Sequence, residues 1–227
     1  MITIILVETS LELMPVEICH VKAIKREAAK KNKKTRHIIL DAARHRPFMV
    51  NFKLKNKDKR GRPDILHRFL LLSLGSLASK KEKLQLYVHT MFDRVFKAEN
   101  DVRFPRNYNR FIGLLEQLLV KGQVPPKGEA LIQIKKQTLE ALLKEIQPKK
   151  VILLSKKGTP VKIKEYLKTL DDLSEENYVF LIGGFSFGEL TPETKKVANE
   201  IISLDEEVLS STVVGAKLIM NYENLIL

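Results

Sequence analysis

Three arginines, Arg103, Arg106 and Arg110, recur at spacings of three and four residues in the run RFPRNYNRFIGLLEQLL. Pro105 lies near the start of this run, and Phe111 and the later leucines recur at helical spacing. The arginines are therefore expected at one end of a helix and on its outer side. A planar guanidinium group binds phosphate oxygens through paired hydrogen bonds. A merely solvated helix face would more often carry lysine and glutamate, so the pattern favours a phosphate-binding cluster.

A single carboxylate stands where it could take part in chemistry. Asp64 precedes an apolar-periodic stretch in RPDILHRFLLLSL (Arg62–Leu74), where it is well placed as the N-cap of a helix. An N-cap residue lies at an exposed junction between loop and helix, so capping does not exclude a second role. Two interpretations stay open here: a helix cap and a functional carboxylate.

Three short apolar runs in the last third of the chain predict a pocket. They are VILLS (Val151–Ser155), VFLIGGF (Val179–Phe185) and IISL (Ile201–Leu204), and each is typical of a buried parallel strand followed by a loop and a helix. Ligands of open α/β sheets bind at the carboxyl ends of the strands. The loops expected to form walls of one pocket are Ser155–Gly158, Gly183–Gly188 and Ser203–Leu209.

Familiar catalytic motifs are missing. The run GGFSFG lacks the Lys-Ser/Thr of a P-loop and is not a GxGxxG fingerprint, and there is no GxSxG elbow. The histidines show no metal-ligand spacing with carboxylates, so no metal is expected. These histidines are His20, His37, His45, His67 and His89. What remains is a neutral, glycine-lined pocket, which suits a cofactor held by backbone amides and apolar contacts.

The elements that must position these residues alternate between strand and helix patterns, so the expected class is α/β. Helical spacing covers Glu12–Lys33, with Pro15 in its first turn, and Gln137–Gln147. Strand patterns cover Ile2–Val7, Ile38–Leu40, Leu84–His89 and Arg94–Lys97, the last two joined by a turn over Met91–Asp93; Gln123–Ile134 is expected to be a loop leading to a short strand.

Basic residues are concentrated in two segments. Arg44–Arg62 holds eight Lys/Arg against one acid, and Phe and Leu alternate with polar residues over Asn51–Lys57. This pattern fits a ribbon that binds RNA phosphates, and it equally fits an edge strand protected by lysines. Lys30–Lys34 is interpreted as a solvated helix end, because cations there complement the helix dipole.

Composition narrows the class of partner. The 227 residues include 40 Lys+Arg and 27 Asp+Glu, for a net charge of +13. Such a charge indicates a polyanionic partner, nucleic acid first and an anionic membrane second, or alternatively a basic or thermophilic proteome.

Cys19 is the only cysteine, no basic leader precedes Glu8, and Phe69–Ala78 is too short to span a bilayer. A soluble cytoplasmic protein is expected.

Three motifs together resemble the archaeal and eukaryotic Nep/Emg family: RPDILHRFLLLSL, RFPRNYNRF and LIGGFSFGEL…IISLDEEVLSSTVV. The likeness covers essentially the whole chain, and it implies a pseudouridine-specific rRNA methyltransferase of the SPOUT class. It further implies one α/β domain over residues 1–227, with a parallel sheet, a C-terminal trefoil knot, and insertions at roughly 44–62 and 98–130. The implied partners are S-adenosylmethionine (leaving S-adenosylhomocysteine), a second copy of the chain, a small-subunit (16S-type) rRNA hairpin, and ribosomal proteins or assembly factors during subunit biogenesis.

The resemblance also implies roles for individual residues. Asp64 is expected to orient the target base or accept its proton, and Arg62 to stabilise the charge left on the ring. The implied RNA-binding residues are Arg62, Asp64, Arg103, Arg106 and Arg110. The implied cofactor-binding residues are Leu154, Ser155, Ile182, Gly183, Gly184, Gly188, Ile202, Ser203, Leu204, Leu209, Ser210 and Val213.

One departure from the family pattern concerns the cofactor loop. Many SPOUT enzymes have a basic or polar residue just after the central glycine pair, whereas Phe185, Ser186 and Phe187 stand there in this chain. The loop is therefore expected to contact its ligand through its backbone. Two other functions remain alternatives: a non-catalytic RNA-binding assembly factor, and a SPOUT methyltransferase that acts on tRNA.

Overall fold

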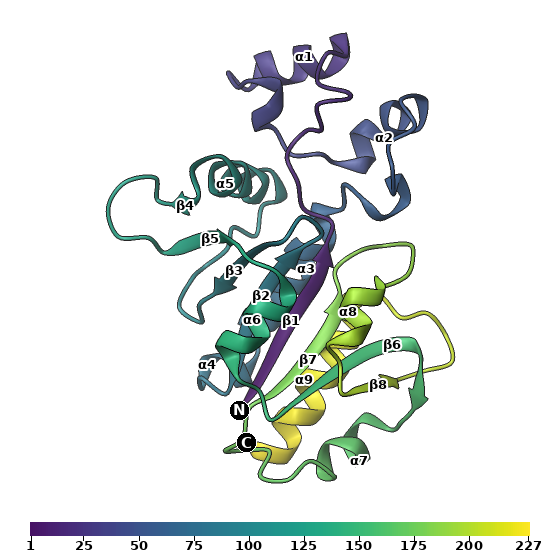
Figure 1. The fold of residues 1–227 in the computed structure, drawn as a ribbon. Coiled ribbons are helices and arrows are strands. Elements are labelled where there is room, and N and C mark those ends of the chain that lie inside the picture. The colour runs from purple at the N-terminus through teal and green to yellow at the C-terminus, as the bar shows by residue number, and fades with distance from the viewer.

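Eight strands form one sheet in the order β4-β5-β3-β2-β1-β7-β6-β8 in the computed structural model, which describes residues 1–227 (Figure 1). β2, β1, β7, β6 and β8 run parallel, and β3, β5 and β4 extend the sheet as antiparallel strands. The strands are β1 (Ile2–Thr9), β2 (Leu84–Thr90), β3 (Arg94–Ala98), β4 (Gln123–Val124), β5 (Ile132–Lys136), β6 (Lys150–Pro160), β7 (Tyr178–Gly183) and β8 (Glu200–Ser203). The predicted parallel sheet and the β2–β3 hairpin are confirmed.

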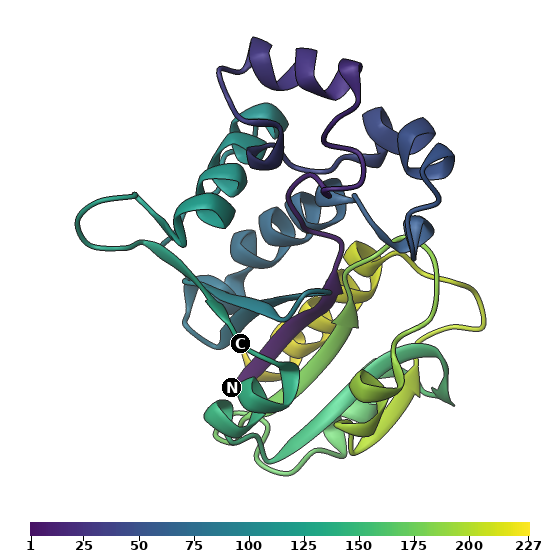
Figure 2. The same cartoon turned by 45° about the horizontal axis from the view of Figure 1, so that its top comes forward.

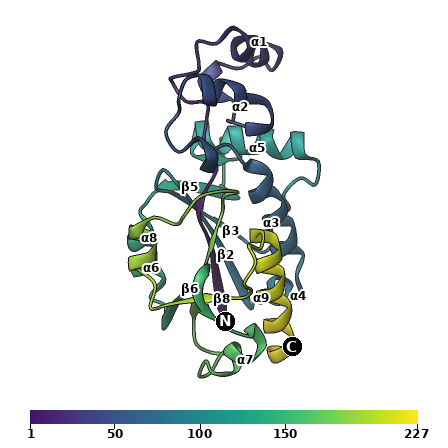
Figure 3. The ribbon, with the colours of Figure 1, turned by 90° about the vertical axis from the view of Figure 1, so that its right-hand side faces the viewer.

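Helices cover both faces of this sheet: α3 and α9 lie on one side, and α6 and α8 on the other (Figure 3). None of the helices is long and apolar enough to cross a bilayer. The helices are α1 (Lys22–Lys30), α2 (Ala42–Asn51), α3 (Pro63–Gly75), α4 (Leu77–Lys80), α5 (Tyr108–Lys121), α6 (Leu139–Ile146), α7 (Ile163–Lys168), α8 (Pro192–Lys196) and α9 (Ser211–Ile226), with short 3-10 turns at Thr35–His37 and Lys57–Lys59.

The central strand β1 is apolar on both faces because both are buried. Ile2, Ile4 and Leu6 pack into the larger core, which contains side chains of α3, α5 and α9. Ile5 and Val7 pack into a second core that contains side chains of α6. A strand covered on two sides is a continuous hydrophobic run rather than an alternating one, which explains the pattern seen in the sequence.

Residues 12–60 form an N-terminal lobe with a small core of its own, above the carboxyl end of β1 (Figure 2). The prediction of one helix over Glu12–Lys33 is wrong for its first half, because α1 begins only at Lys22. Leu13 instead forms a β-bridge with Ile39, and the Met14 amide donates to the Ile38 carbonyl at 2.8 Å. The predicted strand Ile38–Leu40 is reduced to that single bridge.

The predicted ribbon over Asn51–Lys57 is also wrong. The segment before it is helix α2, which is capped by Asp41, whose Oδ1 accepts from the Ala43 amide at 3.0 Å. His45 and Met49, four residues apart, bury one side of this helix in the lobe. Asn51 is the last residue of this helix, and the residues after it form turns that lead into the 3-10 turn at Lys57–Lys59, so the short alternation does not form a strand.

Candidate active site

A cavity of ≈ 720 Å³ lies at the carboxyl ends of β6, β7 and β8. Its walls include residues of all three predicted loops, and Arg62, Ile65 and Arg68 at the start of α3 form a further wall. The size is that of a site for a small organic ligand. Its position agrees with the rule that ligands of parallel sheets bind beyond the carboxyl ends of the strands.

Ten of the twelve predicted cofactor-binding residues line this cavity, and Gly184 and Ile202 do not. Gly184 supports the wall from behind: a Cβ there would lie 2.5 Å from Thr9 Oγ1, and its amide donates to the Val7 carbonyl at 2.8 Å. Ile202 is buried and pairs with Leu154 in the sheet. The ten are Leu154, Ser155, Ile182, Gly183, Gly188, Ser203, Leu204, Leu209, Ser210 and Val213.

Sequence reasoning missed several residues of the cavity wall. Arg68 lies four residues after Asp64, which is one helical turn. That spacing could have predicted that Arg68 lies beside Arg62 and Asp64. The others also lie within the quoted motifs: Ile65 follows Asp64 in RPDILHRFLLLSL, and the remaining five stand in LIGGFSFGEL or IISLDEEVLSSTVV. The missed residues are Ile65, Arg68, Glu189, Leu190, Ser211, Thr212 and Val214.

The first predicted loop is partly strand. β6 does not end at Ser155 but continues to Pro160 beyond an irregularity, and Thr159 and Pro160 pair again with β8. Ser155, Lys156 and Lys157 lie within the irregular part and line the cavity. The other two predicted segments do follow strand ends, and the third leads into α9, where Ser210 Oγ accepts from the Val213 amide at 3.4 Å.

Asp64 lies between two arginines at the start of α3. Its Oδ1 accepts from Arg62 Nε at 2.8 Å, and its Oδ2 accepts from Arg62 Nη2 at 3.0 Å and from Arg68 Nη2 at 2.7 Å. The predicted N-cap is wrong, because Pro63 occupies the first helical position and Arg62 is the cap residue. The carboxylate is thereby free to bind the two guanidinium groups.

The charge state of Asp64 follows from these contacts. Partial burial alone would raise the pKa of Asp64, but the hydrogen bonds and charge of Arg62 and the charge of Arg68 outweigh it and lower the pKa. A carboxylate held in this way is a weak base. This disfavours the expected role of proton acceptor, and the hydrogen bonds point to a role that was not among the expected ones, the orientation of Arg62.

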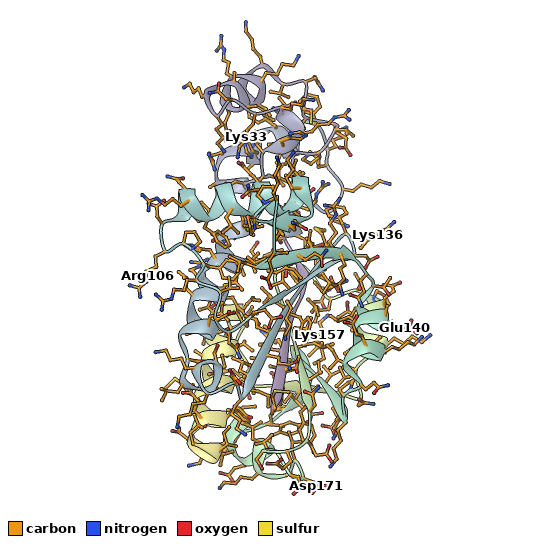
Figure 4. The ribbon with its side chains drawn as sticks, turned by 90° about the vertical axis from the view of Figure 1, so that its left-hand side faces the viewer. Lys33, Arg106, Lys136, Glu140, Lys157 and Asp171 are labelled. Carbon is orange, nitrogen blue, oxygen red and sulfur yellow. The ribbon has the colours of Figure 1, made fainter.

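Three of the four predicted RNA-binding arginines, Arg103, Arg106 and Arg110, lie at the start of α5. Arg103 and Arg106 precede the helix, which begins later than Pro105 suggested because Asn107 is the cap and its Oδ1 accepts from the Arg110 amide at 3.1 Å. All three side chains are exposed and form no hydrogen bond or ion pair within the chain. Arg106 projects from the edge of the molecule (Figure 4).

His67, which shows no signal in the sequence, ties this arginine segment to α3. Its Nε2 donates to the Pro105 carbonyl at 2.8 Å, and its ring lies 4.3 Å from that of Phe111. The residue is buried. One helix, α3, thus carries Arg62 and Asp64 at its start and anchors the Arg103–Arg106 segment one turn later.

A family model described as EMG1/NEP1 methyltransferase matches residues 4–223. A protein of Methanothrix thermoacetophila named ribosomal RNA small subunit methyltransferase Nep1 is 38% identical over 227 residues, which is 100% of this chain and 97% of the relative. The protein of the same name from Sulfurisphaera tokodaii is 40% identical over 220 residues, or 96% and 94% of the two chains. The crystal structure of Archaeoglobus fulgidus Nep1 bound to S-adenosylhomocysteine superposes with a TM-score of 0.84 at 30% identity, covering 98% of this chain and 97% of that one.

Proposed function

The chain belongs to the EMG1/NEP1 methyltransferase family, and we propose that it transfers a methyl group from S-adenosylmethionine to N1 of a pseudouridine in small-subunit rRNA. The observation that carries this proposal is the position of Arg62, which lines a cavity at the ends of β6, β7 and β8 and is held by Asp64, a residue that does not itself line the cavity. One site thus combines a pocket with apolar and charged walls for the donor with a guanidinium group for the base. A role in small-subunit biogenesis follows from such a substrate.

The residues around the cavity fit the proposed donor. Leu154, Ile182, Leu209 and Val213 offer apolar contacts, which suit an adenine ring and a thioether. Gly188 has φ +112, a conformation that favours glycine, so the loop backbone can turn beside the cavity. These residues would hold S-adenosylmethionine, which supplies a methyl group activated by the positive sulfonium.

The chain's own residues then act on the base. N1 of pseudouridine forms the bond to the methyl carbon as the carbon–sulfur bond breaks, and the N1 proton leaves to water. Alignment of N1 with the methyl group is mainly a proximity effect. Arg62 donates a hydrogen bond to a ring carbonyl oxygen, where negative charge collects as the proton departs. Asp64 holds Arg62 in that orientation and is a positioning residue.

RNA binding is assigned to the arginine cluster and to the N-terminal lobe. Residues 12–60 contain 15 Lys/Arg and five Asp/Glu, so the lobe carries +10 of the net charge of +13. Most cations of Arg44–Arg62 pair with acids, and in the Lys30–Lys34 run Lys31 and Lys33 bind the buried Glu116. The lobe cations that are exposed and unpaired are Lys22, Lys25, Arg26, Lys30, Lys34, Arg36, Lys53 and Lys55. They suit contact with phosphates.

Replacing Arg106 by alanine is expected to weaken hairpin binding by about 1–3 kcal/mol and to reduce the salt slope by about one. Gel shifts at several salt concentrations measure both quantities. Lys144→Ala is the matched control, because Lys144 is an exposed cation on α6, paired with Glu140 at 2.9 Å. Equal losses from the two substitutions would show that only overall charge matters and that the arginine cluster has no special role.

Methyl transfer itself is the direct test. The protein is incubated with labelled S-adenosylmethionine and either a pseudouridine hairpin, its uridine twin or tRNA. We expect label in the pseudouridine hairpin alone. Tight hairpin binding without any transfer would favour the assembly-factor alternative, and transfer to tRNA would favour the tRNA methyltransferase.

We further propose that the enzyme is a homodimer with a knotted C-terminal segment. Phe187 and Val208, on two loops that surround the cavity, are 74% and 75% exposed, and Met220 of α9 is also exposed. Phe187 and Val208, which lie on loops beside the same cavity, are exposed apolar side chains of the kind that a subunit interface covers. The close passage of Gly158 over Ile202 supports a threaded chain at the same place.

A further inference from the structure

A lysine from the N-terminal lobe reaches the loop between β7 and α8. Lys59 Nζ donates to the Glu189 carbonyl at 2.8 Å and lies 4.0 Å from the centre of the Phe185 ring. It also forms an ion pair with Glu8, at the end of β1. Lys59 is only 9% exposed. One ammonium group therefore contacts two positions of a loop whose residues Phe185, Gly188 and Glu189 line the cavity.

Glu8 holds the far end of the same loop. Its Oε1 accepts from the Thr191 amide and from Thr191 Oγ1, both at 2.9 Å, and Thr191 is the cap residue of α8. Burial alone would raise the pKa of Glu8, but hydrogen bonds from Lys59, Thr194 and Thr191 outweigh it and lower the pKa. Glu8 has φ +50, an uncommon backbone conformation for a residue with a side chain.

We propose that Lys59 is a positioning residue for the cofactor loop, and that it couples the lobe to the donor site. The ammonium holds Phe185 and the Glu189 carbonyl, while its partner Glu8 holds Thr191. The loop is thereby held at three points in the form that lines the cavity. This inference rests on the proposed function, because it assumes that the cavity binds the donor.

A second buried ion pair shows what a purely structural role would look like. Arg60, the next residue, donates to Glu12 through Nε at 2.7 Å and Nη2 at 2.6 Å. This pair joins the same short segment to the start of the lobe, and Arg60 forms no hydrogen bond with the cofactor loop. Breaking either pair leaves a buried charge without a partner, so both substitutions should destabilise the protein.

The test compares Lys59→Met with Arg60→Met in the full-length protein. Thermal melting measures stability, and calorimetric titration with S-adenosylhomocysteine measures cofactor affinity. Both variants should melt below the parent protein, but only Lys59→Met should lose affinity, by at least about tenfold. Unchanged affinity in Lys59→Met, or equal losses in both, would overturn the inference. Failure of the parent protein to bind S-adenosylhomocysteine would refute the proposed function itself.

Two further variants cover the case in which Lys59→Met does not fold. Glu8→Gln combined with Lys59→Met removes both charges and so leaves neither one unpaired. This double variant should fold and still bind S-adenosylhomocysteine at least about tenfold more weakly. Lys59→Arg keeps a cation near Phe185 and should recover part of the affinity. A double variant that binds as tightly as the parent protein would contradict the assignment.

Discussion

Replacing Arg62 by alanine is expected to lower kcat for methyl transfer by about 10²–10³-fold, the usual cost of removing one preorganised donor from a developing negative charge. Arg62 lines the cavity and is held by two hydrogen bonds to Asp64. Its contribution should arise mainly in the transition state, so the affinity for S-adenosylhomocysteine should change far less than kcat. Single-turnover transfer to a pseudouridine hairpin, with calorimetric titration of the product, measures both quantities.

Arg68 supplies a matched control for this substitution. It binds the same carboxylate and lines the same cavity, but its side chain is 59% exposed, against 32% for Arg62. A more exposed cation stabilises charge less, because water screens it. Arg68→Ala should therefore cost much less than Arg62→Ala. If the two losses were equal, the positive charge of the site would matter rather than one oriented donor.

The pH dependence of the reaction tests the role of Asp64. The pKa of Asp64 lies below the ordinary aspartate value of 3.8. The carboxylate therefore stays ionised until the pH falls below that value. The profile of kcat/KM between about pH 5 and 9 should therefore show no acid limb from this residue. Asp64→Asn should lower the rate at every pH without changing the shape of the profile. An acid limb that disappears in Asp64→Asn would show that Asp64 accepts the proton after all.

The last third of the chain could be predicted well because its signals are local. Each strand is a short, continuous apolar run that ends in a glycine, serine or acid, and buried parallel strands have that composition. Once the three strands are placed side by side, their carboxyl ends must meet at one edge. Most of the cavity wall follows from this rule, including Gly183, Ser203 and Ser210.

The N-terminal lobe could not be predicted from local signals because its contacts are distant in sequence. Leu13 and Met14 carry a helical pattern, but pairing with Ile38 and Ile39 keeps them extended. Lys59 looks like its neighbours in a basic run, because its partners Glu8, Phe185 and Glu189 are all distant in sequence. Its ammonium group lies 4.0 Å from the centre of the Phe185 ring, just after the glycine pair, in a loop whose own residues there carry no cation.

Strands β6 and β8 come into close backbone contact at a crossing beside the cavity. A substitution at this crossing is expected to reduce the stability of the protein strongly. After its irregularity, β6 pairs again with β8, with Thr159 opposite Ile202. Gly158 lies directly against the backbone of Ile202. A Cβ at Gly158 would be 2.5 Å from the Ile202 carbonyl carbon and 2.6 Å from the Ile202 Cα and N. All three are backbone atoms, so no side-chain rotation can relieve the clash. The two strands must separate to admit even one methyl group.

Gly158→Ala should therefore destabilise the protein by about 3 kcal/mol or more, the upper end for overpacking. For a chain of this length, that corresponds to a fall in Tm of about 6–12 °C. Binding of S-adenosylhomocysteine should fail as well, because Ser155–Lys157 and Ser203–Leu204 line the cavity on the two sides of the crossing.

Gly113→Ala is the contrasting substitution, since a Cβ at this position in α5 meets nothing within 4 Å. Alanine there should stabilise the protein by about 0.5–1 kcal/mol through helix propensity alone. Thermal melting and product titration of the two variants separate a packing effect from a general cost of replacing glycine. A Gly158→Ala protein that melts and binds like the parent would mean that β6 and β8 do not cross tightly in solution. The cavity would then need another support, because this crossing holds two of its walls together.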